Sequence, residues 1–176
     1  MKFKTTKIKG LLVIDPDKFS DERGYFLKSF EKTVFLEQGI NMNITQANHS
    51  FNKLKGTIRG MHMQINPFQE DKIIQCIKGK IFDVAIDLRK YSNTYGKWYG
   101  EELSEENKKI FYIPEGFAHG FQTLMDNSEV FYFMSGHYSR NHEVGFRWND
   151  PYFDITWPME PTVIAEKDRK WPLFKR

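Results

Sequence analysis

The sequence predicts an all-β fold, a jelly-roll sandwich with a few short helices. Most of the chain consists of short segments with a period of two, separated by turn residues, and this pattern is typical of an antiparallel sandwich or barrel. We predict strands over residues 10–14, 24–30, 44–48, 57–64, 72–77, 81–88, 98–103, 109–113 and 130–134. Their spacing favours a cupin-type double-stranded β-helix.

The segment 81–88 is the clearest strand, because alternate residues of a strand face opposite sides of a sheet. One side is wholly apolar and carries Phe82, Val84, Ile86 and Leu88. The other side carries two carboxylates together with Ile81 and Ala85, namely Asp83 and Asp87. We expect the apolar side to form core and the other side to be partly polar.

Helix is a minor component of the predicted fold. The best candidate is 31–38, because Gly39 follows it and can adopt the left-handed conformation that ends a helix. A second short helix is expected over 104–108, where Ser104 begins a Ser-Glu-Glu-Asn run that suits a helix start. After Trp148 the density of Pro, Asp and Trp indicates an ordered but irregular tail that wraps the sandwich.

The length and composition favour one domain over residues 1–176. Domains commonly contain roughly 100–200 residues, and the 16% aromatic content provides apolar surface for a packed core. The 26 basic and 23 acidic residues are dispersed and give a net charge of +3. This charge is too small for a nucleic-acid-binding protein but suits a small anionic ligand.

Cysteine usage and the amino terminus indicate a cytoplasmic protein. The lone Cys76 excludes an internal disulfide and favours a reducing compartment. The first ten residues contain no apolar stretch of signal-peptide length, and no later run approaches the length of a membrane span. We therefore expect no membrane partner.

The histidines argue against a metal site. Metal-binding cupins usually place two histidines in an H-x-H pair, so that both imidazoles point the same way along one strand. Here Gln64 stands where the partner of His62 would be. His62 is therefore either a core histidine or a catalytic base, and the neighbouring residues bear on that choice.

Several basic residues could surround His62. Arg59 precedes it on the same segment, and Lys72 follows after a turn-like Asn-Pro-Phe-Gln run. A Pro and two Gly flank His119 inside an apolar segment, which predicts a tight turn that delivers His119 into a barrel mouth. Together these residues predict a cationic pocket suited to a diphosphate-bearing substrate or an enolate. Strict alternation places Arg59 and His62 on opposite faces, so a bulge near Gly60 is required.

An ordered set of blocks covers almost the whole chain and resembles the dTDP-4-dehydrorhamnose 3,5-epimerase family. The blocks are residues 19–26, 46–50, 59–64, 82–89, 113–122, 148–151 and 166–168, with Lys72, Tyr138 and the Trp157-Pro158 pair between them. This resemblance implies a metal-independent epimerase without a cofactor, acting on dTDP-4-keto-6-deoxy-D-glucose on the way to dTDP-rhamnose.

The resemblance also implies roles for particular residues. An epimerase of this kind needs a base, an acid on the opposite face and a cation near the ketone oxygen. These roles map onto His62 as base, Asp168 as the carboxylate that orients it, Tyr138 as acid and Lys72 as enolate stabiliser. The implied substrate-binding residues are Phe19, Arg23, Phe26, Gln46, Asn48, Arg59, His119, Glu143 and Lys167.

The implied assembly is a homodimer, in which Phe19, Arg23 and Phe26 reach the neighbour's pocket. Several alternatives stay open at this point. The enzyme could epimerise only C3 or only C5, or could use a CDP- or GDP-linked sugar. From other classes, a metal-dependent cupin enzyme or a non-catalytic sugar-binding module would share the predicted fold.

Overall fold

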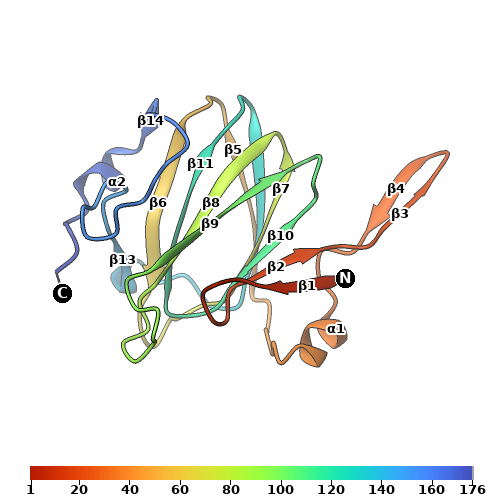
Figure 1. The fold of residues 1–176 in the computed structure, drawn as a ribbon, viewed down its shortest axis with the longest axis horizontal. Coiled ribbons are helices and arrows are strands. Elements are labelled where there is room, and N and C mark those ends of the chain that lie inside the picture. Colours follow the sequence, from red (N-terminus) through yellow and green to blue (C-terminus); the bar gives the residue numbers. More distant parts are fainter. Residues whose placement is uncertain (176) are drawn as a thin grey trace.

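The computed structural model describes residues 1–175 and contains two sheets packed face to face (Figure 1). One sheet has the strand order β1-β2-β10-β7-β12-β5, and the other has the order β13-β6-β11-β8-β9 with β14 paired to β6. Neighbouring strands are antiparallel except for the parallel pair of β14 and β6. This is the expected cupin-type jelly-roll sandwich.

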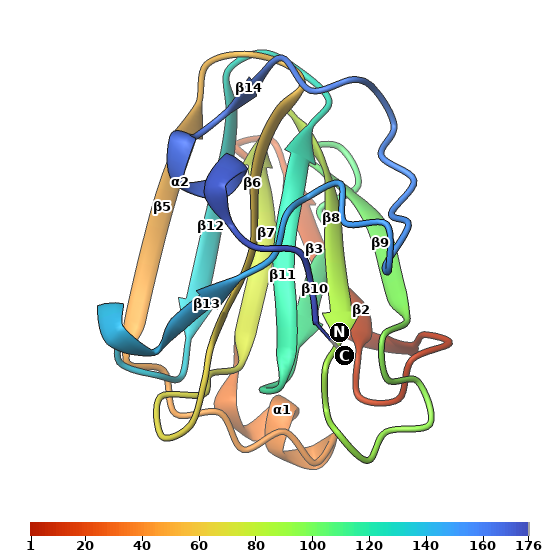
Figure 2. The same cartoon turned by 90° about the vertical axis from the view of Figure 1, so that its left-hand side faces the viewer.

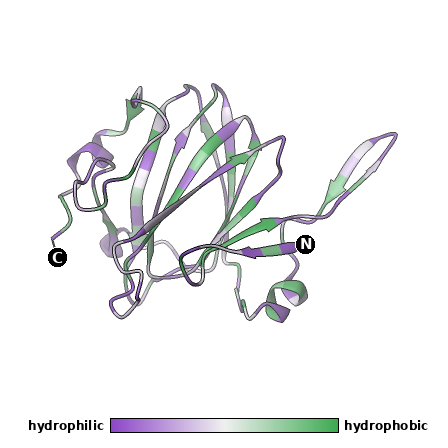
Figure 3. Ribbon diagram, viewed as in Figure 1, coloured by the Kyte–Doolittle hydropathy of each residue, from purple (hydrophilic) through white to green (hydrophobic). Residues whose placement is uncertain are grey.

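The first sheet contains β1 (Lys2–Thr5), β2 (Leu12–Asp15), β5 (Gln46–Asn52), β7 (Lys72–Lys78), β10 (Ile110–Ile113) and β12 (Ser128–Met134). The second contains β6 (Thr57–Gln64), β8 (Lys80–Asp87), β9 (Trp98–Ser104), β11 (Phe117–Thr123), β13 (Glu143–Gly145) and β14 (Val163–Ile164). The predicted strands are all present, and β6 has the predicted bounds. Hydrophobic and hydrophilic residues are interspersed along these strands (Figure 3).

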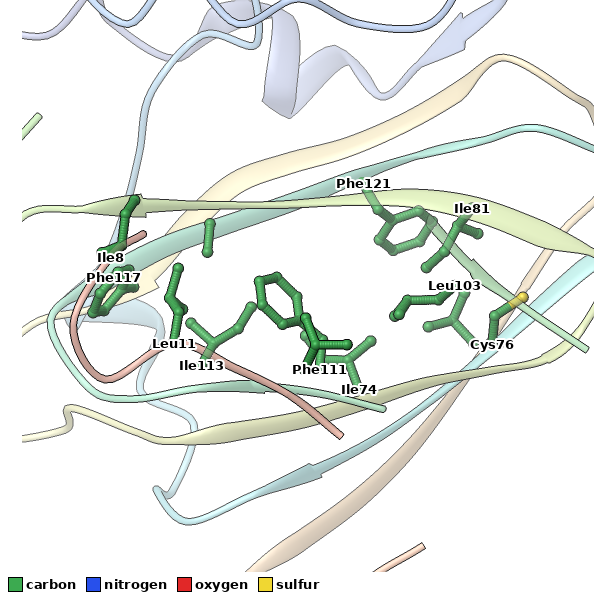
Figure 4. Close-up of a cluster of buried hydrophobic side chains, with 13 residues drawn as sticks. Ile8, Leu11, Ile74, Cys76, Ile81, Leu103, Phe111, Ile113, Phe117 and Phe121 are labelled. Atoms are coloured by element: carbon green, nitrogen blue, oxygen red, sulfur yellow. The ribbon is translucent and has the colours of Figure 1, made fainter. Parts of the chain in front are cut away.

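The main core lies between the two sheets (Figure 4). Phe111 of β10 and Phe121 of β11 are among its largest fully buried side chains. Fully burying one such side chain contributes about 1.5–3 kcal/mol relative to leaving it exposed. No residue of β5 or β6 belongs to this core, and residues of both strands instead line a cavity.

Strand β8 is buried on both faces, which differs from the expectation. Ile81 and Ala85 belong to the core between the sheets. The wholly apolar face instead packs outside the sandwich, where Val84 and Ile86 contact Phe153 of the C-terminal segment. The alternation was predicted correctly, but the sequence pattern alone could not show that a distant segment covers the apolar face.

The C-terminal segment is more regular than expected. It passes over the outer face of the second sheet and forms β14 and the short helix α2 (Glu166–Lys170) beside β6, after which residues 171–175 continue without helix or strand (Figure 2). The first helix, α1 (Lys32–Glu37), lies within the predicted range, and Gly39 after it has a φ of +77°. A 3₁₀ turn, η1 (Arg140–His142), precedes β13.

The helix expected over 104–108 does not form. Strand β9 continues to Ser104, and a turn follows. The N–H of Ser104 donates to Asn107 Oδ1 at 3.0 Å, and the N–H of Asn107 donates to Ser104 Oγ at 3.1 Å. Serine and asparagine side chains bond the nearby backbone in this way, and so compete with helix formation.

A two-stranded arm projects away from the sandwich (Figure 1). It consists of β3 (Lys18–Asp21) and β4 (Gly24–Leu27). Phe19 and Phe26 face each other across this hairpin and are 65% and 61% exposed. Within the described residues, no helix is long and apolar enough to cross a membrane.

Candidate active site

A cavity of about 540 Å³ opens between the two sheets, and residues of β5 and β6 form part of its wall. Nine of the thirteen residues predicted for the site line this cavity. They are Gln46, Asn48, Arg59, His62, Lys72, His119, Tyr138, Glu143 and Asp168. The volume lies in the range of small-molecule sites, about 300–1,000 Å³.

A bulge in β6 lets two of these residues share the cavity. His62 lies opposite His119 on β11, whereas Arg59 lies opposite Phe121, so the two strands shift register between these pairs. Gly60 sits at the shift with a φ of +112°, and a Cβ placed there would lie 2.7 Å from the carbonyl oxygen of His119. The bulge near Gly60 was predicted from strict alternation, and the register confirms it.

His62 is paired with Asp168 of α2. Their Nε2 and Oδ1 atoms are 2.6 Å apart, and the backbone N–H of Gly60 donates to Asp168 Oδ2 at 3.1 Å. Burial disfavours the charged form of Asp168, but the interactions with His62, together with the hydrogen bond from Gly60, lower its pKa overall. An ionised carboxylate only accepts hydrogen bonds, so Nε2 carries a proton, and in the neutral imidazole the lone pair is then on Nδ1.

Tyr138, on the segment between β12 and η1, belongs to a second polar group. Its hydroxyl donates to Glu143 Oε2 at 2.9 Å, and Lys167 Nζ contacts the same oxygen. The hydrogen bond to Glu143 raises the pKa of Tyr138. Tyr138 is 58% exposed at the cavity. It therefore keeps its proton at neutral pH and is exposed to a ligand, two conditions for a general acid.

Lys72, the first residue of β7, forms a buried ion pair with Glu70. Lys72 Nζ lies 2.8 Å from Glu70 Oε1, and the two side chains are 9% and 5% exposed. An ammonium group has three donors. The remaining N–H groups of Lys72 can therefore bind an anionic oxygen in the cavity.

His119 lines the cavity, and the predicted tight turn comes just before the strand that carries it. His119 is in the middle of β11, and the turn is at Gly116, where φ is +83°. His119 Nε2 lies 2.7 Å from Asp83 Oδ1, and Asp83 is fully buried. Burial raises the pKa of Asp83, and the charge and hydrogen bond of His119 oppose that rise. Asp83, on the polar face of β8, thus holds His119 in place at the cavity wall.

Arg59 differs from the other cations of the cavity because neutral oxygens hold it. Its Nε donates to Asn52 Oδ1 at 2.7 Å, and its Nη2 donates to the carbonyl oxygen of Phe51 at 3.3 Å. Gln46 Nε2 donates to the carbonyl oxygen of Gly136. The positive charge of Arg59 has no carboxylate partner among residues 1–175 and remains available to an anionic ligand.

Four predicted residues do not line the cavity. Phe19, Arg23 and Phe26 are on the projecting arm, and Arg23 pairs there with Asp21 at 2.5 Å. Lys167 lies beside the cavity through its contact with Glu143. The fold of one chain therefore does not bring the arm residues to the site.

The sequence reasoning missed several residues of the cavity wall. Gln64 Oε1 accepts a hydrogen bond from the N–H of Ser139 at 3.1 Å and so fixes the segment that carries Tyr138. Tyr132 bonds Ser50 at 2.8 Å, and burial raises its pKa to about 12. Glu70 was also missed, although its position two residues before Lys72 could have suggested an ion pair.

The described part of the chain contains no group of three or more His, Cys, Asp or Glu residues arranged to hold a metal ion. The carboxylates that line the cavity or lie directly behind its wall are instead paired one by one with a basic residue. These pairs are His62 with Asp168, Lys72 with Glu70, His119 with Asp83, and Lys167 with Glu143.

Comparison with known proteins places this arrangement in one family. The profile described as dTDP-4-dehydrorhamnose 3,5-epimerase matches residues 5–176. The enzyme of that name from Methanothermobacter thermautotrophicus is 43% identical over 173 residues, which cover 97% of this chain and 92% of the relative.

Solved structures agree with this match. The Bacillus anthracis epimerase, with TDP and PPi bound, superposes with a TM-score of 0.95 at 39% identity and covers 98% of this chain and 99% of its own. The Legionella pneumophila enzyme, in complex with dTDP-4-keto-L-rhamnose, has a TM-score of 0.93 at 37% identity, covering 98% and 92%. The chain therefore belongs to the dTDP-4-dehydrorhamnose 3,5-epimerase family.

Proposed function

We propose that this enzyme inverts C3 and C5 of dTDP-4-keto-6-deoxy-D-glucose through an enolate intermediate. Both carbons flank the C4 ketone, so removal of either proton gives an enolate whose charge rests on the ketone oxygen. The relative from Legionella pneumophila binds dTDP-4-keto-L-rhamnose, which supports a dTDP-linked keto sugar as the ligand. The cavity volume of about 540 Å³ is compatible with such a sugar.

The single observation that carries the proposal is the 2.6 Å contact between His62 and Asp168 in the cavity wall. A buried carboxylate that holds Nε2 keeps the imidazole oriented and favours its protonated form after proton transfer. In the proposed reaction His62 Nδ1 removes the proton from C5 or C3, and the proton becomes bound to the imidazole. His62 is 32% exposed, which leaves it accessible to a ligand.

Reprotonation on the other face is assigned to Tyr138. The phenol O–H bond breaks as a new C–H bond forms at the carbon of the enolate, and the C4 carbonyl is restored. Lys72 stabilises the enolate oxygen with its N–H groups. Preorganised donors of this kind are typically worth about 10²–10³ in kcat each.

The nucleotide diphosphate is assigned to the cationic rim. Arg59, whose charge no carboxylate in residues 1–175 neutralises, suits the diphosphate, and Gln46 and Asn48 offer neutral donors beside it. His119, Glu143 and Lys167 are the other residues that the family resemblance implies in substrate binding.

We also propose a homodimer in which the arm of one chain completes the neighbour's site. The exposed Phe19 and Phe26 support this assignment, because large apolar residues rarely stay solvated on an isolated hairpin. Light scattering at micromolar concentration tests it, and a fully active monomer would contradict it.

The free, buried Cys76 is compatible with a cytoplasmic location.

The reaction is tested by incubating the purified protein with dTDP-4-keto-6-deoxy-D-glucose in D₂O and following H3 and H5 by NMR. Loss of both proton signals with formation of the C3,C5-inverted sugar is expected. Exchange at one carbon only would reduce the proposal to a single-site epimerase. No exchange in this sugar, with exchange in a CDP- or GDP-linked analogue, would overturn the choice of nucleotide.

A further inference from the structure

Glu70 is a buried carboxylate in the cavity wall, directly beside the lysine assigned to the enolate. Its Oε1 lies 2.8 Å from Lys72 Nζ, and its side chain is 5% exposed. Its other oxygen, Oε2, is buried and has no hydrogen-bond partner in the described part of the chain. The protein contact that holds this carboxylate is therefore the one with Lys72.

The buried pair of Lys72 and Glu70 carries a cost of removing two charges from water. Burying a charge is costly unless an opposite charge accompanies it, and Lys72 and Glu70 satisfy that requirement for each other. A lysine side chain has a flexible four-carbon stem, so a fixed acceptor is needed to hold its ammonium group in one place. One N–H of Lys72 is then directed at Glu70, and the others remain for a ligand.

The fold holds Glu70 in place through the segment that leads to Tyr138. A Cβ on Gly136 would lie 2.8 Å from Glu70 Cβ and 3.1 Å from the carbonyl oxygen of Gln69. The loop before β7 thus packs directly against a glycine backbone, which leaves Glu70 little room to move. Asp83, the other buried carboxylate near Lys72, does not line the cavity and is held by His119.

We propose that Glu70 is a positioning residue for catalysis, which holds the Lys72 ammonium group directed at the ketone oxygen of the substrate. Glu70 acts through Lys72 and need not touch the sugar. This inference rests on the proposed epimerase reaction. It adds a residue that contributes to catalysis only in the step in which the enolate forms.

The test compares kcat and KM of the wild type, E70M, E70Q and K72M, with the double variants E70M/K72M and E70Q/K72M. E70M preserves the approximate shape but removes the acceptor, so kcat should fall about 10²-fold, as for the loss of a preorganised donor. KM should stay within a few-fold, because nucleotide binding is elsewhere. E70Q keeps an acceptor oxygen and should recover roughly tenfold of that loss.

In the K72M background, E70M and E70Q should cause no further loss, because there is no ammonium group left to position. Wild-type kcat in E70M would overturn the proposal, and so would losses that multiply in either double variant. The cycle of wild type, E70Q, K72M and E70Q/K72M does not depend on the folding of E70M. Binding of dTDP checks that each variant retains its site, and failure of the wild type to epimerise would refute the proposed function instead.

Discussion

The substitution Gly60→Ala tests the bulge that brings Arg59 and His62 into one cavity. A Cβ at this position would lie 2.6 Å from Gly120 Cα and 2.7 Å from the carbonyl oxygen of His119. These neighbours are backbone atoms of β11, so they cannot rotate away. The backbone at Gly60, with a φ of +112°, is also one that L-residues rarely adopt.

The expected cost has two parts. Overpacking against rigid neighbours costs about 1–3 kcal/mol, and holding a non-glycine residue in this conformation costs a further 1–3 kcal/mol or so. The free energy of unfolding should therefore fall by about 2–6 kcal/mol, out of a typical total of about 5–15 kcal/mol. For a chain of this length the Tm should fall by roughly 5–20 °C.

Urea and thermal unfolding measure this loss, and Gly24→Ala is the matched control. Gly24 has a φ of +130°, but a Cβ there would meet nothing within 4 Å. The control therefore carries the backbone cost alone, about 1–3 kcal/mol. If Gly60→Ala is no less stable than Gly24→Ala, β6 and β11 do not approach as closely as the bulge requires.

Three further predictions concern the site and the fold. Tyr138→Phe should keep deuterium wash-in but lose net epimerisation, since only the hydroxyl is removed; an equal loss of both would contradict a separate acid. His62→Ala/Asp168→Ala should be little worse than His62→Ala alone in kcat, because the carboxylate then has no imidazole to orient; multiplied losses would separate the two roles. Asp87→Asn should make the free energy of unfolding less dependent on pH between pH 4 and 2. Burial opposes the charged form of Asp87, but hydrogen bonds from Arg89 and other neighbours lower its pKa to about 2. That stability is present above the unfolded pKa of about 3.9 and is lost as pH falls towards 2; urea unfolding between pH 4 and 2 measures it, and an unchanged slope would contradict the assignment.

The sequence predicted the sandwich well because alternation is a local property. Residues 57–64 show this most clearly, since the strand has the predicted bounds and the conflict between Arg59 and His62 pointed to the bulge near Gly60. The turn at Ser104 was mistaken for a helix, because the same residues that begin helices also bond the backbone of turns.

Features that depend on distant contacts were less accessible. The C-terminal segment was expected to be irregular, but part of it forms helix α2, which places Asp168 against β6. The ion pair of Glu70 with Lys72 was missed because its only signal is the two-residue spacing, and a carboxylate in a loop has no periodicity to mark it. Phe19 and Phe26 lie on the arm, away from the cavity of their own chain, and the role proposed for them requires a second chain, which no pattern within one chain can position.

In the proposed reaction His62 removes the proton next to the ketone. This role of His62 is tested most directly by deuterium exchange at C3 and C5 in His62→Asn, measured together with dTDP affinity. Exchange at both carbons should fall by about 10²–10⁴, while dTDP affinity stays at the wild-type value because Arg59 is unchanged. Exchange at the wild-type rate in His62→Asn would contradict the assignment of His62 as the base.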